Sequence, residues 1–324
     1  MIKKIGCLFC CLILILSISA CQKKDEPAIA TLDGENIDEA CFKYYFTELR
    51  KEMQYQYGEV SWQDATFDGK PALEYVRERA LSAAVEDKII TDRAIGDGIE
   101  LSEEDNQEFK NIKQSWIDRY GSENGFYDEI KSNYGLSSDQ FDYMLKAVYY
   151  RKHLVKKYVS DEKSLEFYNS NIVKVKHILI PTIELGSNIP LTADEIKTAR
   201  EKADFILSEV ENGKNFDSLV TEYTADQDAF YYIGAGYSIN IDGSFGAGMV
   251  SEFETASFEL EIGEVSGIVE SPFGYHIIKR YENDEAMYQI SKDNLASIVF
   301  TDILEEWKAQ KTLVINDSIY NSYN

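Results

Sequence analysis

Two apolar segments, each with a histidine near its middle, restrict the fold of this chain more than any other feature of its sequence. The first, at Val173–Pro181, reads VKVKHILIP, and the second, at 274–280, reads GYHIIKR. Both have the length and the β-branched content of strands. Side chains alternate between the two faces of a strand, so His177 and His276 each point away from the face of their chain neighbours. If the strands are neighbours, the imidazoles can meet on one side of a sheet.

Short motifs follow one another in a specific order between these two strands. They are GKNFDSLV at 213–220 with YTAD at 223–226, GMV at 248–250 with Phe253 and ASF at 256–258, GEVS at 263–266 and FGYH at 273–276. In this order they resemble the parvulin family of peptidyl-prolyl cis/trans isomerases. The resemblance implies an α+β fold in which helices surround a small mixed or antiparallel sheet. It also implies that the chain is an enzyme that rotates the bond before proline.

The resemblance assigns catalytic roles to His177, Asp226 and His276. The histidines match the family's hydrogen-bonded pair, and Asp226 stands where the family carries Cys or Asp beside the substrate carbonyl. Rotation about the partly double C–N bond costs about 18–20 kcal/mol, but no bond breaks. The chemistry therefore needs no nucleophile, metal or cofactor, and none is expected. The alternatives are that the histidines only hold the geometry and that Asp226 is a turn residue.

Substrate binding is assigned to Met249 and Phe253, one helical turn apart, which resemble the family's proline-pocket pair. Plain core packing is the alternative for both. Phe273 would extend the apolar wall. The segment 233–248 departs from the family's shorter G-G-D-L-G loop, and its third pocket residue would be Tyr237, with Ile239 and Ile241 as alternatives. This departure puts the shape of the pocket, and with it the activity, in question.

The N-terminus resembles a lipoprotein signal peptide. Residues 1–20 contain Lys3 and Lys4, a short apolar run and small residues before Cys21. The run is shorter than the roughly 20 residues that span a bilayer. Cys21 would be the first mature residue and would carry lipid, with 21–27 as a tether to the membrane. An ordinary signal peptide followed by an incidental cysteine is the alternative.

Charge and cysteine content exclude some classes of partner and framework. The whole chain has a net charge of −24, and because residues 1–20 carry two lysines and no acids, the mature chain would be at −26. Such acidity argues against nucleic acid as a ligand. Cys41 alone remains after processing and lipidation, so no internal disulfide is expected and a buried thiol is predicted.

Hydrophobic periodicity divides the rest of the chain into helical regions. A strand at 28–32 precedes helices predicted at 38–57, 71–96, 102–120, 122–133 and 138–159, and a long helix is predicted at 284–311. We therefore predict a helical, chaperone-like domain at 28–170, an isomerase domain at 171–282 inserted into it, and a C-terminal helix at 283–324 that packs back onto the helical domain. This order is similar to that of the PrsA- and SurA-type extracytoplasmic foldases.

The leading hypothesis is a lipid-anchored isomerase outside the cytoplasm that assists the folding of secreted or envelope proteins. Its partners would be unfolded or partly folded exported proteins with X–Pro bonds, and the membrane through lipid on Cys21. A non-catalytic chaperone with a degenerate parvulin domain is the alternative. A ligand-capturing lipoprotein is a third, disfavoured because no repeated βαβ pattern is present. The sequence specifies neither the clients nor the oligomeric state.

Overall fold

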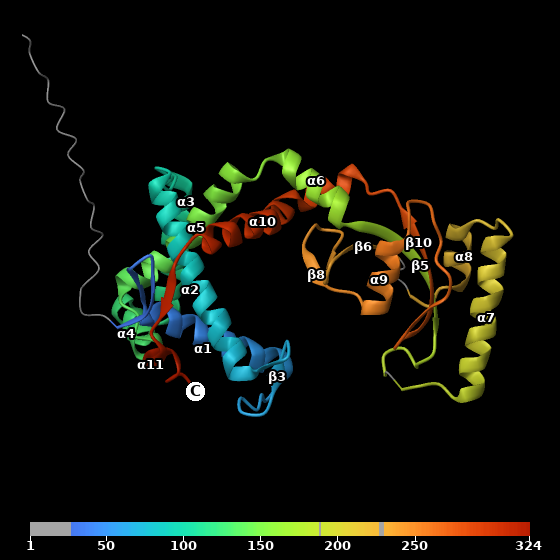
Figure 1. Cartoon of the computed structure of the whole chain (residues 1–324), viewed down its shortest axis with the longest axis horizontal. Helices are drawn as coiled ribbons and strands as arrows, with labels where there is room; N and C mark the ends of the chain where they lie inside the picture. Colours follow the sequence, from blue (N-terminus) through green and yellow to red (C-terminus); the bar gives the residue numbers. More distant parts are fainter. Residues whose placement is uncertain (1–26, 188, 227–229) are drawn as a thin grey trace, which may run out of the picture. The chain divides into compact units, whose positions relative to one another are not determined.

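A computed structural model describes residues 27–187, 189–226 and 230–324 (Figure 1). The predicted signal peptide and Cys21 lie outside the described residues. The chain divides into two compact units. The first contains residues up to Thr91, Ser102–Ala147 and Ala309–Asn324, and the second contains Asp92–Leu101 and Val148–Lys308. Among the described residues, none of the helices is both long and apolar enough to span a membrane.

The first unit is mostly helical, as its sequence pattern predicts. Two of its helices, α2 and α5, continue into the second unit. The helices that contribute to the first unit are α1 (Glu39–Tyr57), α2 (Ala72–Gly96), α3 (Glu103–Arg119), α4 (Glu123–Tyr134), α5 (Ser138–Tyr158) and α11 (Asp317–Tyr320). Ser102 is the N-cap of α3: its side chain accepts a hydrogen bond from the Asp105 N–H, and the Asp105 carboxylate accepts one from the Ser102 N–H. Cys41 is buried beside Phe126, as expected of a packed thiol.

A small antiparallel sheet joins the two ends of the first unit. Its strands are ordered β11-β1-β2, with bounds Leu313–Ile315, Ala28–Leu32 and Glu35–Asp38. Asp33 and Gly34 both have positive φ, at 51° and 86°, which the tight β1–β2 turn requires. Strand β11 was not predicted, because three residues after a long helix carry too little periodicity to distinguish them from its end.

The second unit contains the predicted isomerase sheet. Its strands are all antiparallel and ordered β8-β7-β6-β5-β10-β9. In chain order they are β5 (Val173–Pro181), β6 (Phe230–Gly234), β7 (Tyr237–Ile239), β8 (Phe245–Ala247), β9 (Val269–Ser271) and β10 (Gly274–Tyr281). The α+β fold class and the pairing of the two histidine strands are confirmed.

Helices cover both faces of this sheet (Figure 1). On one face, α7 (Ala193–Glu211) and α8 (Phe216–Tyr223) bury a cluster that includes Ile178 and Ile277. On the other face, α9 (Ser251–Glu259) packs through Phe253 on Val175. The two histidines lie on the face of α9, so the chemistry-bearing side and the larger apolar core are separated by the sheet.

The segment that departs from the family pattern forms two additional strands. β7 and β8 make a hairpin at the edge of the sheet, next to β6. The hairpin turn lies against the last long helix, α10 (Glu285–Ala309), where Asn294 donates a hydrogen bond to the Gly243 carbonyl at 2.9 Å. A Cβ at Gly243 would lie 2.3 Å from the Ile290 carbonyl oxygen, so this contact requires glycine.

Helix α10 packs within the second unit. Met287, Tyr288 and Leu295 form a buried cluster with Tyr168 of α6 (Asp161–Asn171) and with Tyr232 of β6. The sequence predicted that all of 283–324 belongs with the helical domain. In the structure, α10 up to Lys308 belongs to the same compact unit as the isomerase sheet, and only Ala309–Asn324 belongs to the first unit. The predicted boundaries at 170 and 282 themselves stay a prediction.

Candidate active site

His177 and His276 meet on one face of the sheet because of the register between their strands. His177 is opposite Ile278 and His276 is opposite Leu179, so the two histidines are diagonal neighbours. Their Nδ1 atoms are 3.1 Å apart, and their rings are stacked at 5.3 Å with an interplanar angle of 14°. Only 1% of His177 and 4% of His276 is exposed. The pair is therefore a desolvated unit.

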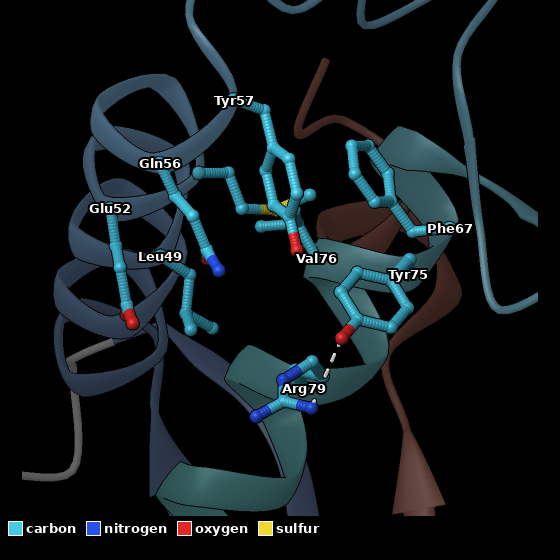
Figure 2. Close-up of a pocket in the computed structure, with 9 residues that line it drawn as sticks. Leu49, Glu52, Gln56, Tyr57, Phe67, Tyr75, Val76 and Arg79 are labelled. Carbon is cyan, nitrogen blue, oxygen red and sulfur yellow. Dashed lines mark hydrogen bonds between the residues drawn. The ribbon is translucent and has the colours of Figure 1, made fainter. Parts of the chain in front are cut away.

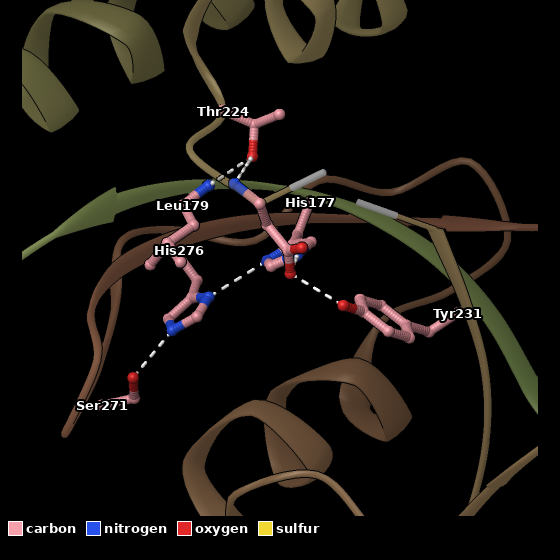
Figure 3. Close-up of polar contacts among 7 residues, drawn as sticks. His177, Leu179, Thr224, Tyr231, Ser271 and His276 are labelled. Atoms are coloured by element: carbon pink, nitrogen blue, oxygen red, sulfur yellow. Dashed lines mark hydrogen bonds and ion pairs between the residues drawn. The ribbon is translucent and has the colours of Figure 1, made fainter. Parts of the chain in front are cut away.

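The histidine pair continues at both ends into further hydrogen bonds (Figure 3). His177 Nε2 lies 3.0 Å from Asp226 Oδ2, which also accepts a hydrogen bond from the Tyr231 hydroxyl at 2.7 Å. At the other end, His276 Nε2 lies 2.7 Å from the Ser271 hydroxyl. Residues from β5, β6, β9 and β10, and from the loop after α8, thus form one connected chain of polar contacts.

The direction of these hydrogen bonds follows from the number of protons available. An ionised Asp226 accepts only, so the His177 Nε2–H donates to it. The Nδ1 atom of a neutral His177 then carries no proton and accepts from the Nδ1–H of His276. His276 Nε2 consequently accepts from the Ser271 hydroxyl, whose oxygen accepts the Phe273 N–H at 3.1 Å. With both imidazoles neutral, each donor in this network of Asp226, His177, His276 and Ser271 faces an acceptor.

The electrostatics of the site favour a neutral His276 imidazole. Burial, and secondarily the nearby His177, lower the pKa of His276 to about 4, an effect that the Asp226 charge only partly opposes. A proton added to the pair would place two N–H groups against each other across the 3.1 Å contact. The network is therefore intact at neutral pH and is disrupted only in acid.

This pKa predicts a pH-dependent stability. A folded-state pKa of about 4 against an ordinary value of 6.5 means that the unfolded chain takes up the proton first. Stability is complete above pH 6.5 and falls by about 3 kcal/mol as the pH drops to 4. Urea unfolding at several pH values, followed by signals from β5 and β10, should show this slope in the unaltered chain. His276→Gln should flatten it; an equal slope in both proteins would contradict the assignment.

Phe253 forms the apolar side of the site. Its ring meets both imidazoles edge-on, at 4.9 Å from His177 and 5.2 Å from His276. It is 1% exposed, whereas Met249 at the start of the same segment is half-buried and packs against the same cluster. Phe273 is 41% exposed and lies in the turn between β9 and β10. The structure brings His177, His276, Asp226 and Phe253 together, as predicted.

The structure does not bring Tyr237 to this group. Tyr237 is paired with Gly234 and lies on the face of Tyr232, opposite to the face of Phe253. Its ring covers Gly234 and lies 5.0 Å from the ring of Phe245, and burial raises its pKa to about 12. The named alternatives do not join the pocket pair either, because Ile239 shares the face of Tyr237 and Ile241 is 84% exposed. A one-residue difference in register inverts the face, and the sequence does not specify the register of an irregular loop.

Three residues of the site were not singled out from the sequence. Ser271 and Tyr231 contact the ends of the network, and the Thr224 hydroxyl accepts the N–H groups of Leu179 at 3.1 Å and Asp226 at 3.3 Å. Tyr231 could have been identified from the alternation of side chains along β6, which places it on the same face of the sheet as Ile233, two residues away. Within the described ranges, no group of three or more His, Cys, Asp or Glu side chains has the geometry to hold a metal ion.

Comparison with known families bears directly on this site. The family model of the PPIC-type PPIase domain matches residues 154–284, which contain the whole network. This segment is a PPIC-type peptidyl-prolyl isomerase domain. The predicted parvulin-type isomerase is thereby confirmed.

Relatives extend the similarity beyond the isomerase domain. The foldase protein PrsA of Caldanaerobacter subterraneus is 27% identical over 286 residues, which cover 84% of this chain and 80% of that protein. A foldase protein PrsA of Bacillus cereus is 29% identical over 320 residues, 97% of this chain and 89% of its own. A crystal structure of PrsA from Bacillus cereus aligns with 92% of this chain and 89% of its own at 21% identity, but the TM-score of 0.36 is too low for a comparison of the folds. The isomerase domain and these relatives support a foldase role.

Proposed function

We propose that this chain is a lipid-anchored foldase that isomerises X–Pro bonds in exported proteins, with His177, His276 and Asp226 as its catalytic group. The observation that carries the proposal is the buried imidazole pair, hydrogen-bonded to a carboxylate and packed against Phe253, inside a PPIC-type domain. A desolvated polar chain beside an apolar wall is what proline isomerisation needs: a dry slot for the ring and polar groups that discriminate between amide geometries.

Asp226 would act through its charge. The planar amide is stabilised by resonance that places partial negative charge on the carbonyl oxygen. A carboxylate beside that oxygen disfavours the planar form, and the twisted amide, which has lost the resonance, is disfavoured less. Asp226 suits this role because its side chain is 24% exposed, at the solvent end of a network whose His177 is buried. The imidazoles would fix the carboxylate rather than exchange protons with the substrate.

The prolyl ring would lie against the partly exposed Met249, with the buried Phe253 behind it and Phe273 at the open edge. Phe273 is exposed and its N–H donates to Ser271, so the apolar rim and the network share one turn. Tyr237 has no part in this pocket, because it lies on the opposite face of the sheet. The unusual segment 233–248 would then modify the edge of the domain and leave its active face intact, which supports turnover.

A proline-limited peptide assay on the chain from Gln22 onward tests this function. Turnover that is lost in Asp226→Ala, in a protein that remains folded, would support it. An inactive but folded chain that suppresses aggregation of an unfolded client would instead make this a chaperone with a parvulin fold. Absence of both activities would contradict the foldase assignment.

Lipid attachment at Cys21 rests on sequence alone. A basic start, a short apolar run and small residues before the cysteine are the supporting pattern. Two acyl chains anchor a protein stably, while a single chain does not. We expect the mature chain to enter the detergent phase on phase separation and to carry lipid on Cys21 by mass spectrometry, and Cys21→Ser to remain in the aqueous phase. A mature N-terminus at another residue would exclude the anchor.

The exported clients are inferred from the anchor and from the relatives, which are foldase proteins PrsA. The predicted location is outside the cytoplasm, at the membrane surface. A mature net charge of −26 would disfavour nucleic acid and other anionic partners and would tolerate basic client segments.

A pocket in the first unit favours chaperone binding as a second function of the same chain. It has a volume of about 120 Å³ and lies between α1 and α2 (Figure 2). Tyr57, Phe67 and Tyr75 form a continuous aromatic wall, with ring centroids 5.2 Å and 5.8 Å apart. A cavity of about 150 Å³ holds benzene, so this one suits a single apolar side chain. The peptide assay and the aggregation assay distinguish isomerisation from chaperone binding, because only isomerisation requires Asp226.

A further inference from the structure

Tyr231 lies beside the catalytic group because of its place in β6. It is paired with Val175, so it shares the face of His177, two residues further along β5. Its ring centroid is 5.6 Å from that of His177 and 6.4 Å from that of Phe253. Its hydroxyl donates a hydrogen bond to Asp226 Oδ2 at 2.7 Å. A strand outside the histidine pair thus contacts the carboxylate directly (Figure 3).

Two donors from different strands converge on one carboxylate oxygen. Oδ2 of Asp226 receives the His177 Nε2–H at 3.0 Å and the Tyr231 hydroxyl at 2.7 Å. Asp226 itself is on the loop after α8, where its backbone N–H donates a hydrogen bond to the Thr224 hydroxyl. Its partly exposed side chain lies on a loop and not on a strand, so these donors help to set its orientation. Hydrogen bonds to a carboxylate also favour its ionised form.

We propose that Tyr231 is a positioning residue for the isomerase reaction, whose hydroxyl orients the Asp226 carboxylate and keeps it ionised. The proposal rests on the function proposed above. By keeping Asp226 ionised, Tyr231 also sets the direction of the hydrogen bonds in the network, since an ionised carboxylate can only accept and His177 Nε2 must then donate. The titratable groups that face Asp226 among the described residues are His177 from β5, Tyr231 from β6 and, one step away, His276 from β10, while α9 contributes the apolar Phe253.

The neighbouring tyrosine provides a matched control. The Tyr232 hydroxyl donates to Asp284 Oδ2 at 2.6 Å on the opposite face of the sheet. Tyr231→Phe and Tyr232→Phe therefore each remove one tyrosine–carboxylate hydrogen bond from adjacent positions of one strand. The ¹³C signal of the Asp226 carboxyl is followed through a pH titration in both variants and in the unaltered chain. Tyr231→Phe should raise the pH of titration by about one unit, and Tyr232→Phe should leave it unchanged.

Activity provides the second readout. Tyr231→Phe should lower kcat/KM in the proline-limited assay about fivefold, and it should have no further effect in an Asp226→Ala background. An unchanged Asp226 titration, or an equal loss in both backgrounds, would overturn the proposal. If the unaltered chain has no turnover, the proposed function fails, and the carboxyl titration alone still decides whether Tyr231 positions Asp226.

Discussion

Asp226→Ala is expected to lower kcat/KM for a proline-limited peptide by about 100-fold, the scale of losing one preorganised electrostatic group. The substitution removes the charge that we propose acts on the substrate carbonyl, and it leaves the His177 Nε2–H without its acceptor. The imidazole pair then loses the group that fixes its tautomers. Steady-state kinetics should place the loss mainly in kcat, because the carboxylate acts on the twisting amide and not on the bound ring.

A matched carboxylate separates this effect from a loss of stability. Asp217 also accepts a hydrogen bond from a tyrosine, Tyr281, and pairs with a cation, Lys176, on the face away from the site. Asp217→Ala should leave kcat/KM within about twofold of the unaltered value, because its partially exposed pair contributes little. Asp226→Asn, which keeps the shape and removes the charge, should resemble Asp226→Ala. If Asp226→Asn is fully active, Asp226 acts only as a hydrogen-bond acceptor.

Much of the site was predictable from the sequence because it depends on strand parity and local spacing. His177 and His276 lie on the same face of the sheet in the observed register of β5 and β10, and a shift by one residue would place them on opposite faces. The apolar residues of the two strands leave little choice of register. Phe253 lies in α9, but Met249 precedes the N-cap Val250, so the expected spacing of one helical turn is wrong and Phe253 was identified through the family motif alone. The helix caps at Ser102 and Thr192 depend only on residues within one turn, so their sequence pattern is enough to predict them.

The parts that were not predicted depend on long-range packing. The hairpin of β7 and β8 has strands of three residues each, too short for a periodic signal, and it is held in place from α10 by the contact at Gly243. In this hairpin, Tyr237 lies on the face of the sheet opposite to that of Phe253. Strand β11 gains its conformation from pairing with β1, almost the whole chain away. Such contacts leave no local trace in the sequence.

Phe253→Ala is expected to lower the stability of the isomerase domain strongly and to weaken substrate binding as well. Phe253 is fully buried against Val175 and the two imidazoles, so its truncation should cost about 3–5 kcal/mol in the free energy of unfolding of the isomerase domain. Loss of the wall behind the prolyl ring should remove about 2 kcal/mol of binding, or roughly 30-fold in kcat/KM. Kinetics are measured in the cold, where the variant is still folded.

Phe216→Ala decides whether Phe253 is a pocket residue or only part of the core. Phe216 is equally buried, but it packs on Ile178 and Leu219 on the face covered by α7 and α8. Its truncation should cost a similar free energy of unfolding and leave kcat/KM of the folded protein nearly unchanged. If both variants lose activity only in proportion to the unfolded fraction, then Phe253 is a core residue. A loss confined to Phe253→Ala, expressed mainly as a higher KM, places the prolyl ring against its side of the sheet.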